Sequence, residues 1–249
     1  MSFLEKFKNN NEEIPRRLPD KEAQEFIANK INVDEIEKKL EGKDPFSGTV
    51  ETLARLVLEL GDRLPKYDTI ISDDASARLV SLLVRKIINL KKEEAGEKPV
   101  ETYFVAAGAR HNSPGIYNKI NEFIASKKDN FKNTLLITEF IYSGTSIGNI
   151  IKILEKNKIK FDIAAVSVAK SPKSYDRQIA KHLYYGNRGE QDVGRGGLYF
   201  YNTSNISGVM KVDVPDAIHP AVYLDADKIK MKEARKDIDL IADELVKLV

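Results

Sequence analysis

The sequence predicts an α/β protein in which a parallel β-sheet carries helices on both faces. From Tyr67 onward, short apolar runs alternate with segments whose apolar residues recur at helical spacing. Polar loops separate each apolar run from the helix that follows it. Strands that alternate with helices in this way pair in parallel through right-handed crossovers. Ligands of such sheets bind at the carboxyl ends of the strands, so we expect the site in the loops that follow the strands.

The alternating part of the chain, residues 67–190, forms the predicted α/β core. The apolar runs place its strands at 69–71, 100–107, 134–137, 161–169 and 182–186. Helical spacing places the intervening helices at 79–90, 116–126 and 147–156, with a polar linker at 91–99. Each predicted helix therefore follows a strand directly, as a parallel sheet requires.

The segments on either side of this core have a different pattern. Residues 1–66 are predicted to form a helical N-terminal extension or hood, with helices at 21–31, 33–40 and 50–60. Residues 191–249 are predicted to form a C-terminal elaboration that packs on the core. Its expected parts are a loop rich in glycine and polar residues up to 208, a hairpin near 198–201 and a final helix at 225–248.

Composition excludes several functional classes. The chain of 249 residues has no cysteine, which excludes disulfides, thiolate metal sites and a cysteine nucleophile, and it fits a cytoplasmic location. No apolar run approaches the roughly 20 residues that span a bilayer, and the N-terminus has no signal-peptide pattern. The net charge of +2 is nearly balanced, so we expect neither a membrane nor a nucleic acid as partner.

The clearest functional signal is the segment from Leu135 to Ile147. An apolar strand is followed by a loop that carries Glu139 and then a cluster of hydroxyl residues around Gly144, immediately before a helix. The free N–H groups and positive dipole at a helix start bind anions, and glycine lets the backbone approach the anion closely. The alternative is an ordinary helix cap, for which a single serine or threonine is enough.

This segment resembles the phosphoribosyl-diphosphate (PRPP) loop of type I phosphoribosyltransferases. In that motif an apolar strand leads to two adjacent acidic residues and then to Asp-Thr-Gly-Thr-Thr at a helix start. Glu139 matches the second acidic position, whereas Thr138 replaces the first. Tyr142 replaces the aspartate before the hydroxyl cluster. The resemblance implies that PRPP or its 5′-phosphate is bound by Tyr142, Ser143, Gly144, Thr145 and Ser146.

Two further loops carry residues that suit the same ligand. Asp73 and Asp74 follow the first strand, and paired carboxylates can hold Mg²⁺ together with substrate phosphates. The resemblance implies Mg²⁺ as cofactor, a position of Glu139 near the ribose hydroxyls, and diphosphate contacts from Ser76, Arg78 and Arg110. Paired carboxylates are unusual in that family at the position of Asp73 and Asp74, and we expect these two residues and Glu139 to be catalytic. The alternatives are that an aspartate caps the following helix and that Arg110 faces solvent.

The resemblance implies a Mg²⁺-dependent glycosyltransferase that moves ribosyl phosphate from PRPP to a nitrogen acceptor. Thr138 and Tyr142 favour an alternative, a non-catalytic nucleotide-binding or regulatory homologue. The expected partner is a small phosphoribosyl compound or nucleotide, and a homodimer remains open. A second alternative is an α/β-hydrolase, because residues 144–148 also match G-x-S-x-G. In that case Ser146 is the nucleophile, Asp213 or Asp216 the acid and His219 the base.

Overall fold

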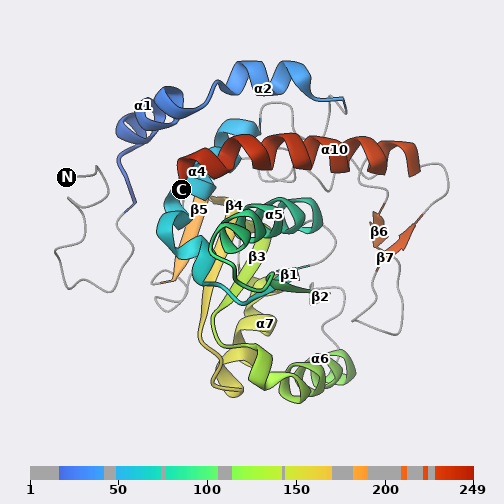
Figure 1. The fold of residues 1–249 in the computed structure, drawn as a ribbon. Coiled ribbons are helices and arrows are strands. Elements are labelled where there is room, and N and C mark those ends of the chain that lie inside the picture. The colour runs from blue at the N-terminus through green and yellow to red at the C-terminus, as the bar shows by residue number, and fades with distance from the viewer. Residues whose placement is uncertain are drawn as a thin grey trace.

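The computed structural model contains a five-stranded sheet with helices on both faces (Figure 1). The strands are ordered β2-β1-β3-β4-β5, and every neighbouring pair is parallel. The strands are β1 (Thr69–Asp73), β2 (Glu101–Val105), β3 (Thr134–Ile141), β4 (Phe161–Ala169) and β5 (Leu183–Gly189). The predicted fold class is therefore confirmed.

The structure describes residues 17–41, 49–73, 77–105, 114–141, 144–169, 182–189, 209–211, 221–223 and 228–249. Within these ranges, two short strands, β6 (Val209–Lys211) and β7 (Ala221–Tyr223), form a separate antiparallel pair that the sequence did not predict. The predicted hairpin at 198–201 lies outside the described residues. No helix in the described ranges is long and apolar enough to cross a membrane.

Helices precede, connect and follow the strands. The α-helices are α1 (Asp20–Lys30), α2 (Val33–Lys39), α4 (Val50–Leu60), α5 (Arg78–Glu94), α6 (Pro114–Ser126), α7 (Thr145–Lys156) and α10 (Lys228–Leu245). Short 3₁₀ helices are η2 (Gly61–Lys66), η4 (Lys128–Asn130) and η6 (Val246–Leu248). The backbone N–H of Glu35 donates to the Asn32 side chain at 3.1 Å, which caps the start of α2.

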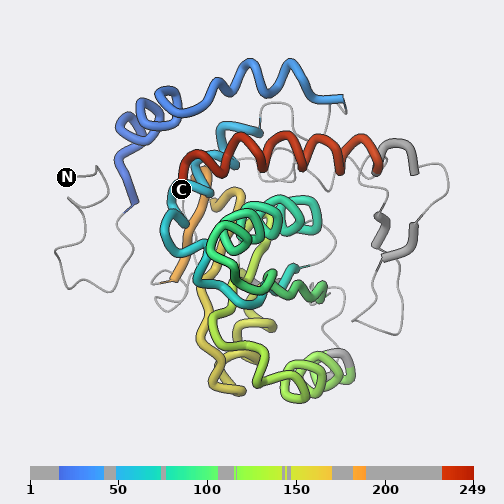
Figure 2. Tube along the Cα trace, viewed as in Figure 1, coloured from blue at the N-terminus to red at the C-terminus, as the bar shows by residue number. Residues whose placement is uncertain are grey.

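Each face of the sheet carries its own apolar core, because successive side chains of a strand point to opposite faces. Leu135 and Ile137 of β3 pack in the core beneath α4, α5 and α10, whereas Leu136 packs in the core formed with α6 and α7. Figure 2 shows these two layers, with the sheet between them. Strands buried on both faces have the nearly continuous apolar sequence that identified them.

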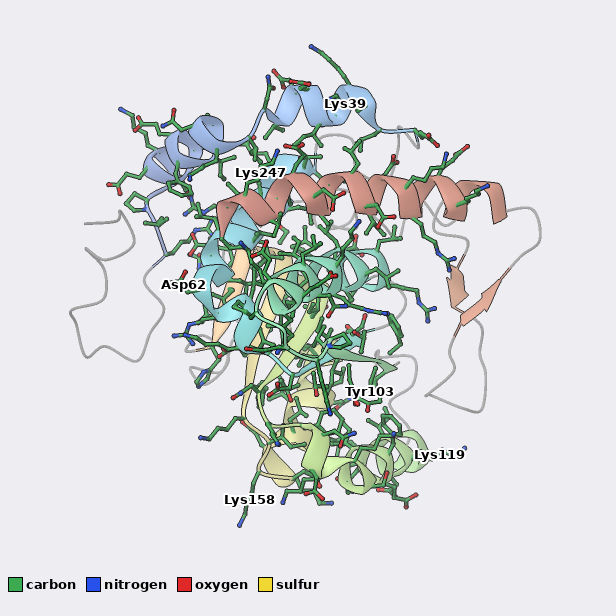
Figure 3. The ribbon with its side chains drawn as sticks, viewed as in Figure 1. Lys39, Asp62, Tyr103, Lys119, Lys158 and Lys247 are labelled. Carbon is green, nitrogen blue, oxygen red and sulfur yellow. The ribbon has the colours of Figure 1, made fainter. Side chains whose placement is uncertain are left out.

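The first and the last described helices pack together on one side of the sheet. Helices α1 and α2 lie across α4 and α10 (Figures 1 and 2), and Ile27, Ile36 and Leu245 belong to the same apolar core as the sheet. Charged side chains such as Lys39 and Lys158 point outward, as Figure 3 shows. The boundaries of the three predicted segments stay predictions.

Two elements extend beyond their predicted ends. The polar linker predicted at 91–99 begins later, because α5 continues to Glu94 and buries Lys92, whose amino group lies 3.0 Å from Glu97. The prediction that β3 ends at residue 137 is also wrong, because β4 continues to pair with it as far as Ile141 opposite Val168. This second difference changes the surroundings of Glu139.

Candidate functional site at the β1–β3 switch point

The order of the strands reverses between β1 and β3, at the centre of the sheet. From β1 the chain crosses to β2 on one side, whereas β3, β4 and β5 are added in succession on the other. In open α/β sheets with this order, ligands bind at the carboxyl ends of the two strands that meet at such a switch point. The segments that follow β1 and β3 are those in which the sequence placed the candidate residues.

Asp73 and Thr138 meet at this point from the two neighbouring strands. Ser72 pairs with Ile137, so the next residue of each strand lies beside the other. The hydroxyl of Thr138 donates to Asp73 Oδ2 at 3.3 Å, and Asp73 is only 6% exposed. A carboxylate that leaves water requires polar partners. The position that lacks an acidic residue in β3 therefore has a carboxylate beside it, from β1.

Glu139 lies inside β3, where its side chain has no exposed surface. The sequence placed this residue in a loop after the strand, and that placement is wrong because β3 extends to Ile141. Alternation along the strand directs Glu139 to the opposite face from Thr138. Its proposed role towards a ligand stays a prediction.

Gly144 forms the turn between β3 and α7. Its φ of 75° is in the left-handed region, which glycine adopts without steric cost. Gly144 is the N-cap of α7, and its carbonyl accepts the first helical bond from the Gly148 N–H at 2.8 Å. The cap residue has no side chain, so the N–H groups of the first turn receive no bond from it. The simple alternative of a serine or threonine at the cap position is therefore wrong.

Arg78 lies at the same edge of the sheet, as the first residue of α5. Its guanidinium is 4.4 Å from the centre of the Phe104 ring, near the end of β2. The turn before it is short, because the Ala77 N–H donates to the Asp73 carbonyl at 3.3 Å. Asp73 and Thr138 thus lie within β1 and β3, and Arg78 and Gly144 stand at the starts of the helices that follow these two strands.

The remaining candidates lie outside the described residues: Asp74, Ser76, Arg110, Tyr142, Ser143, and the hydrolase residues Asp213, Asp216 and His219. The backbone of Thr145 and Ser146 is described as the start of α7, without their side chains. Within the described ranges, no three acidic or histidine side chains gather as a metal site. The magnesium site stays a prediction, and Asp73 is the described residue that fits it.

A polar cluster lies at the amino-terminal end of the strands, away from the candidate site. The hydroxyl of Tyr67 donates to Asp162 at 2.7 Å, and burial, with the nearby Asp162 charge, raises the pKa of Tyr67. The same two causes raise the pKa of Tyr184 to about 12. Both phenols therefore stay protonated at neutral pH.

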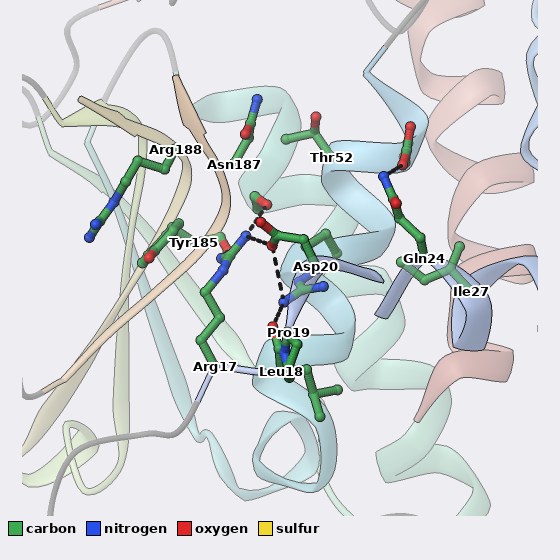
Figure 4. A pocket seen from close by; sticks show the side chains of 13 residues that line it. Arg17, Leu18, Pro19, Asp20, Gln24, Ile27, Thr52, Tyr185, Asn187 and Arg188 are labelled. Atoms are coloured by element: carbon green, nitrogen blue, oxygen red, sulfur yellow. Dashed lines mark hydrogen bonds and ion pairs between the residues drawn. The ribbon is translucent and has the colours of Figure 1, made fainter. Parts of the chain in front are cut away.

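The sequence did not reveal one further feature, a pocket between α1, α4 and β5 (Figure 4). Its walls come from residues 17–27, 51–55 and 185–188. No motif links segments so far apart in the chain. Only the packing of the N-terminal helices on β5 brings them together.

Comparisons with known proteins give distant similarities. No protein-family model and no curated protein matches the chain. Among solved structures, an orotate phosphoribosyltransferase from Aeropyrum pernix is 12% identical and has a TM-score of 0.35, with 55% of this chain and 69% of that chain covered. A hypoxanthine phosphoribosyltransferase from Staphylococcus aureus is 13% identical and has a TM-score of 0.38, with 57% of this chain and 76% of that chain covered.

A phosphoheptose isomerase from Francisella tularensis is similar at the same level. It is 9% identical and has a TM-score of 0.36, with 90% of this chain and 97% of that chain covered. Phosphoribosyltransferases and a phosphoheptose isomerase therefore score alike. The function of the chain has to be inferred from its own residues.

Proposed function

We propose that the β1–β3 switch point binds PRPP or another ribose compound with a 5′-phosphate. The observation that carries the proposal is Gly144, a left-handed glycine that opens α7 directly after a buried strand. The first helical hydrogen bond runs from the Gly148 N–H to the Gly144 carbonyl, so the N–H groups of residues 145–147 have no acceptor within the helix and can donate to phosphate oxygens. The positive end of the helix dipole adds a favourable charge interaction.

Asp73 is proposed to supply the carboxylate that β3 lacks at Thr138. The hydrogen bond from Thr138 orients Asp73 at the end of β1, beside β3. Mg²⁺ prefers oxygen ligands and keeps several waters or substrate oxygens. Asp73 would therefore hold a magnesium ion that is mainly coordinated by the diphosphate of the substrate and by water.

Transfer of ribosyl phosphate is the reaction that this arrangement would support. The bond between C1 of the ribose and the diphosphate oxygen breaks, a bond from C1 to the acceptor nitrogen forms, and the proton of that nitrogen passes to water. The leaving diphosphate gains negative charge, which Arg78 at the start of α5 can stabilise. Catalysis of this kind depends on positioning and charge rather than on a covalent intermediate.

A non-catalytic nucleotide-binding protein is the second candidate, and it is favoured by the absence of acidic residues at Thr138 and Tyr142. Incubation with PRPP, Mg²⁺ and a panel of nucleobases distinguishes the two. Release of diphosphate that depends on one base supports the transferase. Tight binding of PRPP or a nucleoside monophosphate without diphosphate release supports the binding protein.

Asp73→Asn tests the proposed magnesium role. Because the amide keeps an oxygen that can accept from Thr138, we expect the fold to persist. Loss of a charged ligand is expected to weaken Mg²⁺-dependent PRPP binding by about 1.5–3 kcal/mol, or roughly 10- to 100-fold. Calorimetry with and without Mg²⁺ measures this change. The exposed Asp129→Asn is the matched control, and equal affinity of the two variants would contradict the assignment.

Ser146→Ala separates the phosphate loop from the hydrolase alternative. A nucleophile elbow places its serine on a strained turn between strand and helix. Here the left-handed turn residue is Gly144, whereas Ser146 is the second residue of α7. We therefore expect Ser146→Ala to cost about 1–2 kcal/mol in phosphate affinity. Labelling of Ser146 by a fluorophosphonate probe in the unmodified protein would instead establish the hydrolase.

A further inference from the structure

The pocket at the β5 edge has the size and position of a separate small-molecule site. Its volume is about 620 Å³, within the range of roughly 300–1,000 Å³ that is common for ligand pockets. It lies between α1, α4 and β5, the outermost strand, and β4 separates β5 from β3. The pocket is thus distinct from the β1–β3 switch point.

Two arginine side chains that line this pocket are held in place by hydrogen bonds, and Figure 4 shows one of them, Arg17, beside Asp20 and Tyr185. Arg17 donates to the carbonyls of Tyr185 and Gly186, the latter at 3.1 Å, and its guanidinium lies 4.1 Å from the centre of the Tyr185 ring. These contacts fix the orientation of a side chain that would otherwise be flexible. An ordered guanidinium loses less freedom when it binds an anion.

Arg55 is the second of these arginines, and its side chain is only 7% exposed. It donates to the Leu18 carbonyl and pairs with Glu59 at 2.8 Å. Burial lowers the pKa of Arg55 and raises the pKa of Glu59, which reflects the cost of removing this pair from water. An additional anion beside Arg55 would stabilise its buried positive charge.

The carboxylate of Asp20 lies between the two guanidiniums. It is 3.4 Å from Arg17 and 3.6 Å from Arg55, and its side chain is 82% exposed. Water screens this exposed carboxylate even though Arg55 itself is buried, and ion pairs with an exposed partner contribute little, about 0–1 kcal/mol. Asp20 therefore occupies the position of an anion without being firmly held there, and a stronger anion can displace it.

The other walls of the pocket add one cation and a polar surface. Arg188 lies 5.4 Å from the centre of the Tyr185 ring and has no ion-pair partner in the part of the chain that the structure describes. On the opposite wall, the Gln24 side chain donates to Glu51 at 3.2 Å, beside Thr52. Amide, carboxylate and hydroxyl groups suit a ligand body that has hydroxyl groups of its own.

We propose that this pocket binds a small phosphorylated molecule of the sugar-phosphate type, whose phosphate displaces Asp20 from Arg17 and Arg55. Phosphate offers several oxygens in a geometry that matches two guanidinium groups. Its sugar hydroxyls face Gln24, Glu51 and Thr52. The site does not depend on the proposed PRPP loop, since it shares no residue with it.

Calorimetric titration of the full chain with ribose 5-phosphate and with inorganic phosphate tests the proposal. The titration is performed on the unmodified protein and on Gly144→Val, which is expected to remove phosphate binding at the loop after β3. Binding is expected to persist in Gly144→Val. Asp20→Asn removes the competing carboxylate and should tighten binding about 3- to 10-fold, whereas Arg17→Gln should weaken it about 10-fold or more.

The exposed Asp34→Asn in α2 is the control for Asp20→Asn and should leave the affinity unchanged. Because Arg17 also anchors the N-terminal segment to β5, the thermal stability of Arg17→Gln is measured together with its phosphate affinity. Asp20→Asn leaves Arg17 in place and tests the site independently of this anchor. Weaker or unchanged binding in Asp20→Asn overturns the proposal. If Gly144→Val abolishes all binding and Asp20→Asn on its own has no effect, the pocket site is contradicted and the ligand binds only at the loop after β3.

Discussion

Replacement of Gly144 by valine is expected to abolish measurable binding of PRPP at the β1–β3 switch point. At a φ of 75°, a β-branched residue carries a strain of about 1–3 kcal/mol, which the turn relieves by changing its backbone. The N–H groups of α7 then no longer converge, and the new side chain occupies the space of the phosphate. We expect the affinity to fall more than about 100-fold, or about 3 kcal/mol, in calorimetric titrations.

Gly96→Val is the matched control for this variant. Gly96 has a similar φ of 69° after α5, and no atom lies within 4 Å of a Cβ placed there. Its backbone strain should lower stability to a comparable degree without reaching the loop. PRPP affinity that falls equally in both variants would show that Gly144 acts only through stability. Retained affinity in Gly144→Val would remove the phosphate site from this loop.

Gly186→Ala is expected to cause the largest loss of stability among single-methyl changes at the described glycines. A Cβ at this position would lie 2.2 Å from the Thr52 carbonyl oxygen and 2.8 Å from that of Val166. Both neighbours are backbone atoms, so α4 has to move away from β5. Overpacking of this kind costs about 1–3 kcal/mol or more, and the backbone clash places this variant at the upper end.

Urea denaturation of Gly186→Ala measures that cost directly. Gly115→Ala in α6 is the control, because a Cβ there has open space and alanine favours the helix. The control should match or slightly exceed the unmodified protein in stability. A Gly186→Ala protein with an unchanged urea midpoint would mean that α4 and β5 are not in such close contact. The same variant should also disturb the pocket that α4 and β5 enclose.

Much of the fold was predictable because its signals are local. The helix at 50–60 and the strand at 161–169 were predicted at the bounds that the structure has. In both, the period of apolar residues matches the geometry of one element, and glycine or polar residues end it. The end of β3 was missed because pairing with β4 extends it through Thr138 and Glu139. Pairing between strands leaves no mark on either sequence alone.

The candidate site also has one part that the sequence predicts and another that depends on the tertiary structure. The sequence sufficed to identify Gly144 and its neighbours as a turn at a helix start, because a glycine between hydroxyl residues after an apolar strand is a local pattern. The hydrogen bond between Asp73 and Thr138, and the pocket of Arg17, Arg55 and Tyr185, depend on the tertiary structure. These residues are separated by long stretches of chain, and strand order, register and helix packing determine which of them meet.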